Sequence, residues 1–297
     1  MNRIRAEYKI DELHNKGITG QKINIAVIDT GINGMDAELK DSCIFQYDII
    51  GGRKYPYDDN GHGTHVAGII SAKGIYKNGM YKGIAPDSKI VSIKALDKTG
   101  KGSFDNFIKG IDFIIRFHKK FNIRVVNMSV GAPNTTEDSR KLDDAIDEMY
   151  YNGIVVVAAA GNNGPANGSV ASPGNNRNAL TVGAYDDNRE IKLSKSRVLK
   201  NYSGRGPTNE CVVKPEILAD GYHIVSVSHK GGYVSASGTS MATPIVSGMI
   251  SLLLSKYPDL SPKEVKKIVH DTAIDLDMQK IKQGWGKIGI QNYILRE

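Results

Sequence analysis

Three short stretches of the sequence contain the residue types that nucleophilic catalysis requires. Asp29 ends the apolar run KINIAVID, His62 opens the stretch HGTHVAGII, and Ser240 lies in the stretch SGTSMATP. A serine hydroxyl becomes a nucleophile when a base accepts its proton, and that base needs a carboxylate that fixes its tautomer and stabilises its cation. Small residues surround all three, so a substrate backbone could approach them. The pattern predicts an Asp–His–Ser site that attacks carbonyl groups.

The position of Ser240 favours the same chemistry. The run from Met241 to Leu254 is apolar and has room for several helical turns, so Ser240 lies where a helix should begin. The unpaired N–H groups and the positive dipole end of a helix N-terminus stabilise negative charge that develops beside the serine oxygen. Serine and threonine are also ordinary helix caps. The prediction of a nucleophile therefore depends on Asp29 and His62 as well.

Strands and helices alternate along most of the chain. Apolar β-branched runs predict strands at 22–29, 89–96, 123–128, 154–160, 180–184 and 224–227. Helical spacing and capping patterns predict helices at 62–70, 104–117 and 142–151 and another from 261 onward. This alternation predicts an α/β fold, doubly wound, with a mostly parallel sheet and helices on both faces. Nothing in the composition divides residues 1–297, so a single domain is expected. Asp29 would lie at the carboxyl edge of the sheet, where α/β folds place their sites.

The composition argues against several other kinds of function. The chain has 297 residues, of which 40% are hydrophobic and 24% charged, and its net charge is +7. Its basic residues are spread out and are not interleaved with aromatic residues, so no nucleic-acid partner is predicted. The segment 1–11 lacks the apolar core of a signal peptide, and no apolar run approaches the ~18 residues of a membrane span. Cys43 and Cys211 fit no metal or redox spacing. We expect a cytoplasmic protein with two free thiols and no membrane partner.

Longer motifs surround the three candidate residues. They are VIDTGI at 27–32, HGTHVAG at 62–68 and GTSMA at 238–242. In these motifs and in their order the chain resembles the subtilisin family of serine proteases, and the likeness extends from about Leu13 to about Ala273. Within that family the chain most resembles the intracellular subtilisins. The resemblance implies a catalytic triad of Asp29, His62 and Ser240, and a structural role for His65.

The resemblance also implies an oxyanion hole and a substrate cleft. Asn162 in AAGNNG matches the oxyanion asparagine of the family, whose amide would donate together with the backbone N–H of Ser240. Two segments resemble the edge strands between which an extended peptide pairs as an added strand. Small residues beside the scissile position would leave room for a large apolar side chain, and Phe104 with Phe107 would line a more distant apolar subsite. The implied substrate-binding residues are Gly100, Lys101, Gly102, Phe104, Ser129, Val130, Gly131, Gly161 and Ala171.

The implied function is a serine endopeptidase that cleaves extended peptide or protein substrates through an acyl-enzyme on Ser240. Two alternatives stay open. One is a pseudoprotease that binds peptides without cleaving them, against which the intact triad and Asn162 argue. The other is a maturation protease dedicated to one precursor peptide. The sequence predicts neither the cleavage preference nor the oligomeric state.

Some features depart from the family pattern or extend it. Asp220 stands near the cleft where the family often has a proline. Neither a signal peptide nor a long inhibitory pro-domain is recognisable, so residues 1–10 are expected to be a short N-terminal extension. The segment around Ser172–Pro173 resembles one that holds a cis proline beside the specificity pocket. A cis bond is therefore predicted here.

No metal or cofactor is expected to take part in the chemistry. His62 and His65 have a spacing that metal sites use, but no third ligand is evident. Subtilisin relatives often bind a structural calcium ion in the loop after the histidine helix, here residues 72–83, helped by a carboxylate near the position of Glu38. That loop contains three lysines and no carboxylate, whereas calcium takes 6–8 oxygen ligands and gains affinity from their charge. A structural calcium ion is therefore doubtful, and we predict that this loop binds none tightly.

Overall fold

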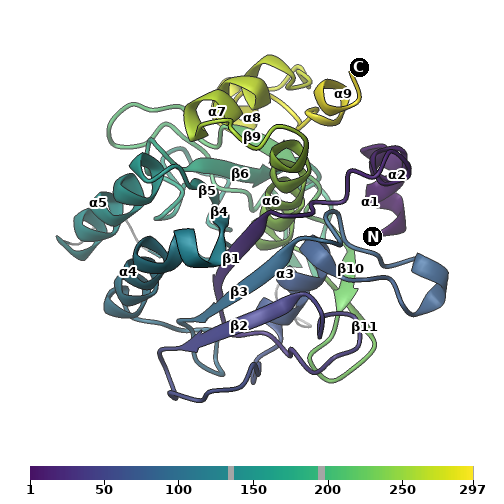
Figure 1. The fold of residues 1–297 in the computed structure, drawn as a ribbon. Helices are drawn as coiled ribbons and strands as arrows, with labels where there is room; N and C mark the ends of the chain where they lie inside the picture. Colours follow the sequence, from purple (N-terminus) through teal and green to yellow (C-terminus); the bar gives the residue numbers. More distant parts are fainter. Residues whose placement is uncertain (133–136, 193–197, 297) are drawn as a thin grey trace.

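A central parallel sheet organises the protein. The computed structural model describes residues 1–132, 137–192 and 198–296, and Figure 1 shows how the chain is arranged. Seven strands form the sheet in the order β2-β3-β1-β4-β5-β6-β9, and neighbouring strands are parallel. Their bounds are Asn24–Asp29 (β1), Cys43–Asp48 (β2), Lys89–Lys94 (β3), Ile123–Met128 (β4), Val155–Ala159 (β5), Leu180–Ala184 (β6) and Ile217–Ala219 (β9).

Helices cover both faces of this sheet, as the sequence predicts. α4 (Phe104–Phe121) and α5 (Glu137–Tyr151) pack on one face. α3 (His62–Ser71) and α6 (Thr239–Lys256) pack on the other. Each face has its own apolar core, because successive side chains of a strand point to opposite faces. A strand between two such cores is buried on both sides and therefore forms a continuous apolar run such as VVVAA in β5.

The helix α6 is buried along most of its length. Its residues from Met241 to Leu254 are all buried, and they are apolar or small around the whole circumference of the helix. A helix with this composition belongs in a protein interior. It lies against β4, β5 and β6 and beside α3. The first turn of α6, which contains Ser240, is consequently fixed by the core on that side of the sheet.

Two strands of the main sheet are absent from the sequence prediction. β2 lies at one edge, and three of its six residues are exposed or half-buried, so its sequence CIFQYD contains no long apolar run. β9 lies at the other edge and is only three residues long. The predicted strand at 224–227 does form, as β10 (Ile224–Val227), but it pairs with β11 (Tyr233–Ala236) in a separate antiparallel hairpin. Helices α4 and α5 each extend beyond their predicted bounds.

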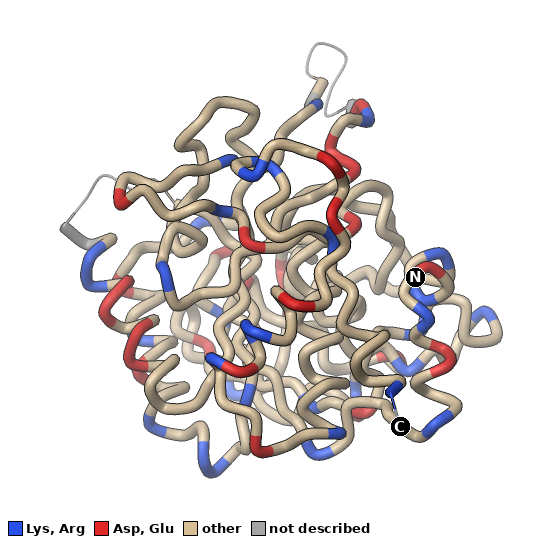
Figure 2. Tube along the Cα trace, turned by 90° about the horizontal axis from the view of Figure 1, so that it is seen from above, with Lys and Arg blue, Asp and Glu red and all other residues tan. Residues whose placement is uncertain are grey.

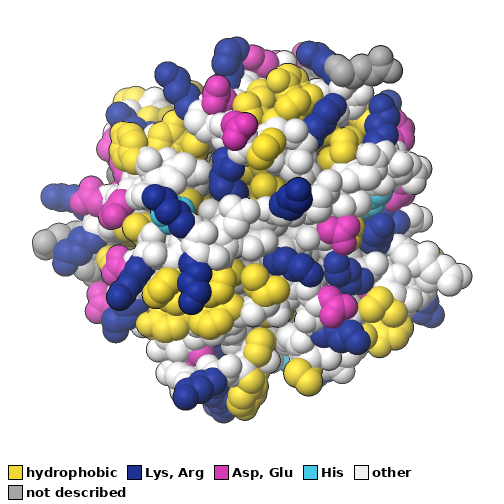
Figure 3. Space-filling model, viewed as in Figure 1, with side chains coloured by type: hydrophobic (Ala, Val, Ile, Leu, Met, Phe, Trp, Pro, Cys, Tyr) yellow, Lys and Arg dark blue, Asp and Glu magenta, His cyan; other side chains and the backbone are white. Residues whose placement is uncertain are grey.

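Shorter elements complete the described chain. They are α1 (Asn2–Glu7), α2 (Ile10–Asn15), η1 (Lys77–Gly79), β7 (Ile191–Lys192), β8 (Val198–Leu199), α7 (Pro262–Asp271), α8 (Lys280–Gln283) and α9 (Gln291–Ile294). No helix of the described residues has the length and apolar character to cross a membrane. Basic and acidic residues are interspersed over the trace in the view of Figure 2. On the face shown in Figure 3, lysine and arginine lie between acidic and apolar side chains.

The N-terminal residues pack on the body of the protein. Met1, Ile4 and Tyr8 are buried and join the core on the α6 side. The hydroxyl of Tyr8 donates to the Asp220 carboxylate (2.7 Å), and the guanidinium of Arg3 donates to the other carboxylate oxygen (2.8 Å). Asp220, which replaces the proline of the family pattern, is fully buried and faces these helices rather than the cleft. It therefore anchors α1.

Replacement of Tyr8 by Phe should lower the free energy of unfolding by about 1.5–3 kcal/mol, because the buried Asp220 carboxylate loses a hydrogen-bond donor. Urea unfolding in a Ser240→Ala background, which removes the expected protease activity, provides the measurement. Tyr151→Phe is the matched control, since the Tyr151 side chain is 79% exposed. Equal losses for the two variants would contradict the anchoring role of Asp220.

Candidate active site

Asp29 and His62 meet at the carboxyl end of β1. Asp29 is the last residue of that strand and is almost completely buried, and His62 is the first residue of α3. The Nδ1 atom of His62 lies 2.7 Å from Oδ1 and 2.9 Å from Oδ2 of Asp29. The backbone N–H of Thr30 also donates to Oδ1 (2.7 Å). The carboxylate is thus fixed from two sides, and the Nε2 atom of the imidazole stays available for other chemistry.

The sequence around His62 explains this close approach. A Cβ atom at Gly63 would lie 2.1 Å from the carbonyl oxygen of Gly31 and 3.1 Å from Cβ of Asp29. Only a glycine lets the helix begin against the end of β1. Gly61, which precedes the helix, has φ +110°, a conformation that also favours glycine. These two glycines therefore place the His62 ring over the Asp29 carboxylate.

Asp58 fastens the loop before α3, and the sequence analysis did not identify it. Its Oδ1 atom accepts hydrogen bonds from the Thr30 hydroxyl (2.9 Å) and the Gly61 N–H (2.8 Å). Its Oδ2 atom accepts from the N–H and the hydroxyl of Thr64 (3.0 and 2.7 Å). The stretch DDNGHG contains a signal of this role, because a carboxylate just before a helix commonly accepts bonds from unpaired N–H groups.

The charge of Asp29 acts on the protonation of His62. Burial of the imidazole opposes its charged form, but the charge and hydrogen bond of Asp29, with a contribution from Asp58, outweigh burial and raise the pKa of His62. His65 behaves oppositely, since burial and the neighbouring His62 lower its pKa to about 4. Its Nε2 atom lies 3.1 Å from the carbonyl oxygens of Ile224 and Val234. The His65 ring therefore joins α3 to the β10–β11 hairpin.

Ser240 lies in the first turn of α6, next to Ser129. The Ser240 hydroxyl donates to the Ser129 carbonyl (3.1 Å), and the Ser129 hydroxyl donates to the Ser240 carbonyl (3.0 Å). In the described part of the chain, no hydrogen bond joins Ser240 to His62. Ser129 and His62 both line one cavity, so Ser240 and His62 belong to the same region. The Ser240 hydroxyl would have to turn away from Ser129 to reach the imidazole.

Asn162 follows β5 and lies beside the start of α6. Its Oδ1 atom accepts hydrogen bonds from the N–H and the hydroxyl of Thr239, both at 3.1 Å. A Cβ atom at Gly238 would lie 3.2 Å from Nδ2 of Asn162, so the two segments are in close contact. With Oδ1 held by Thr239, the Nδ2 group has no acceptor among the described residues. The amide is thus oriented with a free donor beside Gly238 and Thr239, the two residues that precede Ser240.

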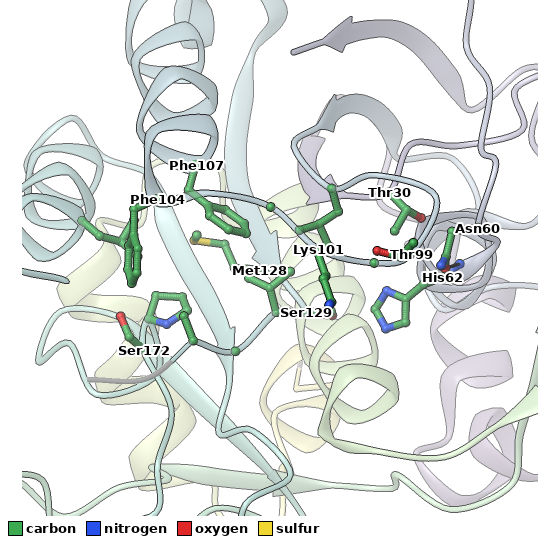
Figure 4. A pocket seen from close by; sticks show the side chains of 18 residues that line it. Thr30, Asn60, His62, Thr99, Lys101, Phe104, Phe107, Met128, Ser129 and Ser172 are labelled. Atoms are coloured by element: carbon green, nitrogen blue, oxygen red, sulfur yellow. Dashed lines mark hydrogen bonds between the residues drawn. The ribbon is translucent and has the colours of Figure 1, made fainter. Parts of the chain in front are cut away.

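A cavity of about 640 Å³ extends from His62 to the aromatic residues of α4 (Figure 4). His62 and Asn60 lie at one end, and Phe104 and Phe107 lie at the other. Among the predicted site residues, those that line it are His62, Gly100, Lys101, Gly102, Phe104, Phe107, Ser129, Val130 and Gly131. Ser172 and Pro173, which the sequence analysis expects beside the specificity pocket, also line it. The other lining residues, which the sequence analysis did not assign to the cleft, are Thr30, Asn60, Leu96, Thr99, Met128, Ala132 and Leu142.

Gly161 and Ala171 lie against each other beside this cavity, not in its lining. A Cβ atom at Gly161 would come within 2.7 Å of Cβ of Ala171, and one at Gly131 within 3.2 Å. The three small residues therefore form one packed contact next to the loop that carries Asn162. The Ser172–Pro173 bond that follows Ala171 is cis, as predicted.

Two segments, Gly100–Gly102 and Ser129–Gly131, were expected to resemble the edge strands of the cleft. Neither of them is a strand in the structure. The turn around Asp97 uses the backbone of Lys101, whose N–H donates to the Asp97 carboxylate (3.1 Å) and whose carbonyl accepts from the Asp97 N–H (2.8 Å). In contrast, the backbone groups of Gly102 and Gly131 take part in no hydrogen bond among the described residues. These two glycines, which both line the cavity, present free donors and acceptors.

The loop after α3 is held by groups that a calcium ion would have to displace. The Glu38 carboxylate accepts from the N–H groups of Gly74 (2.6 Å) and Tyr76 (3.0 Å) and from a tyrosine hydroxyl of β11. The buried guanidinium of Arg5 donates to the carbonyls of Met80 (3.3 Å) and Lys82 (3.0 Å). A cation already occupies those two carbonyls, so the residues present do not fit calcium. No cluster of three metal-binding side chains occurs within the described ranges.

Comparisons with known proteins agree on one family. The profile of the Subtilase family matches residues 20–286. Serine protease AprX of Bacillus subtilis (strain 168) is 37% identical over 272 residues, which cover 85% of this chain and 61% of that protein. Subtilisin DY of Bacillus licheniformis is 33% identical over 270 residues, or 90% of this chain and 89% of that protein. The solved structure of Sphericase has a TM-score of 0.76 and 28% identity and covers 92% of each chain.

The Asp29→Asn substitution should lower the pKa of His62. The carboxylate raises that pKa in the present structure, and a neutral amide leaves burial to act with less opposition. NMR titration of the His62 ring measures the change, with Asp41→Asn, an exposed site, as the control. Because a protonated His62 cannot accept a proton, activity should fall on acidification through a midpoint above the ordinary value for histidine. An unchanged His62 pKa in Asp29→Asn would contradict the pairing.

Proposed function

The chain belongs to the subtilase family and is a subtilisin-like serine endopeptidase, and we propose that it cleaves peptide bonds through an acyl-enzyme on Ser240. The observation that supports this assignment most is the contact of 2.7 Å between His62 and the buried Asp29 carboxylate. Nδ1 of His62 faces that carboxylate, so Nε2 is the ring nitrogen that can accept a proton. The hydrogen bond from the Ser240 hydroxyl to Ser129, which lines the same cavity as His62, supports a common site for Ser240 and His62.

In the proposed mechanism His62 first acts as a base. Nε2 takes the proton of the Ser240 hydroxyl as the oxygen forms a bond to the carbonyl carbon of the substrate, and Asp29 stabilises the imidazolium. The tetrahedral intermediate then breaks its C–N bond, and His62 gives the proton to the leaving amine. A water molecule, deprotonated by His62, then attacks the acyl carbon, and the C–O bond to Ser240 breaks as His62 returns the proton to the Ser240 oxygen.

Asn162 is proposed to stabilise the oxyanion of that intermediate. Thr239 holds Oδ1 of the amide, so Nδ2 can donate to an oxygen that develops charge near Ser240. The backbone N–H of Ser240, in the first turn of α6, would supply the second donor. Both donors are fixed before the reaction, and donors preorganised in this way lower the barrier of acyl transfer.

The cleft fits a peptide in extended conformation. Gly102 and Gly131, which line it, offer unpaired backbone groups, and an added strand binds through such groups. The small residues Gly161 and Ala171, which lie against each other, are proposed to border the pocket that holds the side chain of the residue before the scissile bond. Residues further toward the amino end of the substrate would extend along the cavity to Phe104. We propose no nucleic-acid partner, because basic residues are dispersed among acidic ones (Figure 2), and we propose a cytoplasmic location.

A fluorophosphonate probe should label Ser240 covalently, because only a serine activated by a base reacts at a useful rate. Mass spectrometry of the labelled peptide identifies the residue. The Ser240→Ala variant should be neither labelled nor active, with an unchanged circular dichroism spectrum. A folded wild-type protein that is not labelled would instead indicate a peptide-binding pseudoprotease.

The Asn162→Ala variant should still react at Ser240 but lose roughly 10²–10³ in kcat with little change in KM, a magnitude known from subtilisin itself. The reason is that the amide acts mainly on the transition state. Steady-state kinetics on one peptide substrate provide the measurement. A change confined to KM would make Asn162 a ground-state contact.

We also propose that the loop after α3 is stable without calcium, because Glu38 and Arg5 satisfy its backbone groups. The midpoint of thermal unfolding, measured in the Ser240→Ala background, should be the same in EDTA and in millimolar calcium. Arg5→Met should lower it, since two loop carbonyls lose a donor. A calcium-dependent rise of roughly ten degrees, lost on changing Glu38, would show tight linkage of the ion to the folded state.

A further inference from the structure

Lys101 is a side chain of the cleft that the proposed mechanism leaves unused. Among the described residues that line the cavity, it alone carries a side chain that is charged at every ordinary pH. The glycines on either side add no side chain, and a Cβ atom at Gly102 would lie 2.5 Å from the carbonyl oxygen of Ala95. Lys101 is therefore the one side chain that this wall segment presents to a substrate.

The position of Lys101 is set by its backbone. Both of its backbone polar groups are bonded to Asp97, which fixes the direction in which the side chain leaves the wall. Figure 4 shows the side chain extending across the cavity between His62 and Phe107. The ammonium group therefore lies between the reacting end of the cleft and its apolar end.

The ammonium group of Lys101 forms no hydrogen bond or ion pair within the part of the chain that the structure describes, and its only electrostatic effect there is a minor lowering of the pKa of Asp97. Two carboxylates of the neighbouring segments, Asp97 and Asp59, already have other hydrogen-bond or ion-pair partners. Asp97 accepts bonds from the N–H and hydroxyl of Thr99 as well as from the Lys101 N–H. Asp59 is paired with the buried Lys94 (2.7 Å). An anionic group that enters the cleft would thus meet a cation without an ion-pair partner.

We propose that Lys101 selects substrates with an acidic side chain two to four residues before the scissile bond. The inference rests on the proposed function, because that function orients the peptide along the cavity. A peptide in extended conformation advances about 3.3 Å per residue, and Lys101 lies between His62 and the apolar end, so we assign it to residues a few positions before the scissile bond. The substrate class is a peptide that combines Asp or Glu with an apolar residue at Phe104 and Phe107.

The effect should be modest, because Lys101 is exposed and exposed ion pairs are weak. We expect a preference of roughly tenfold for Glu over Lys at the position that meets Lys101, since attraction and repulsion both contribute. The preference should decline in high salt, which screens exposed charges.

Peptides that differ only by Glu, Gln or Lys at the second, third or fourth residue before the scissile bond test this proposal. The readout is kcat/KM for each peptide with the wild-type protein, with Lys101→Glu and with Lys98→Glu. Lys98 is an exposed lysine of the same turn that does not line the cavity. The Lys98→Glu variant therefore controls for the change in electrostatic potential that reversal of any nearby charge would cause. The Glu preference should reverse in Lys101→Glu and persist in Lys98→Glu.

Binding of the same peptides to the Ser240→Ala variant, followed by fluorescence anisotropy, separates this inference from the proposed function. A Glu preference in binding that disappears with Lys101→Glu supports the inference even if the wild-type protein cleaves nothing. Cleavage and binding without a charge preference at any of the three positions overturn it while the proposed function stands. A preference that persists unchanged in Lys101→Glu also overturns it.

Discussion

The hydrogen bond between His62 and the buried carboxylate of Asp29 is the contact on which the rest of the site depends. It requires a strand that ends in the interior and a helix that begins against it. Gly63 permits that approach, and Asp58 fixes the loop by bonds to both elements. The result is an imidazole whose Nδ1 atom and pKa are both set by a carboxylate that water hardly reaches.

A long-range framework brings the nucleophile to this pair. The parallel sheet places the end of β1 beside the end of β4, and α6 packs behind both strands. Ser129 and Ser240 are therefore in contact, although they are far apart in the sequence. The chain before α6 is tied in turn to the body, because the Gly238 N–H donates to the Gly221 carbonyl (2.8 Å). Gly221 follows Asp220, the anchor of α1. The N-terminal helices thereby support the segment that carries Ser240.

Local sequence was enough to predict the central strands and to single out Asp29 and His62, which the structure brings into contact. The buried runs around β1, β4 and β5 are apolar and continuous, and Asp29 and His62 occur in long motifs. The edge strand β2 was missed, because an edge strand is half accessible and has no such run. Asp58 and Arg5 were missed for another reason. Their partners are set by the folded arrangement, so neither residue type nor spacing reveals them, and the direction of Asp220 toward α1 is unpredictable on the same grounds.

The central claim is that Asp29, His62 and Ser240 act as one unit. The most direct measurement compares kcat/KM for His62→Ala, Ser240→Ala and the double variant on one peptide substrate, each corrected for the fraction folded. Residues that act together are strongly non-additive. The account predicts that the double variant is no slower than either single variant. Losses that multiply in the double variant would show that His62 and Ser240 act independently, and would contradict the account.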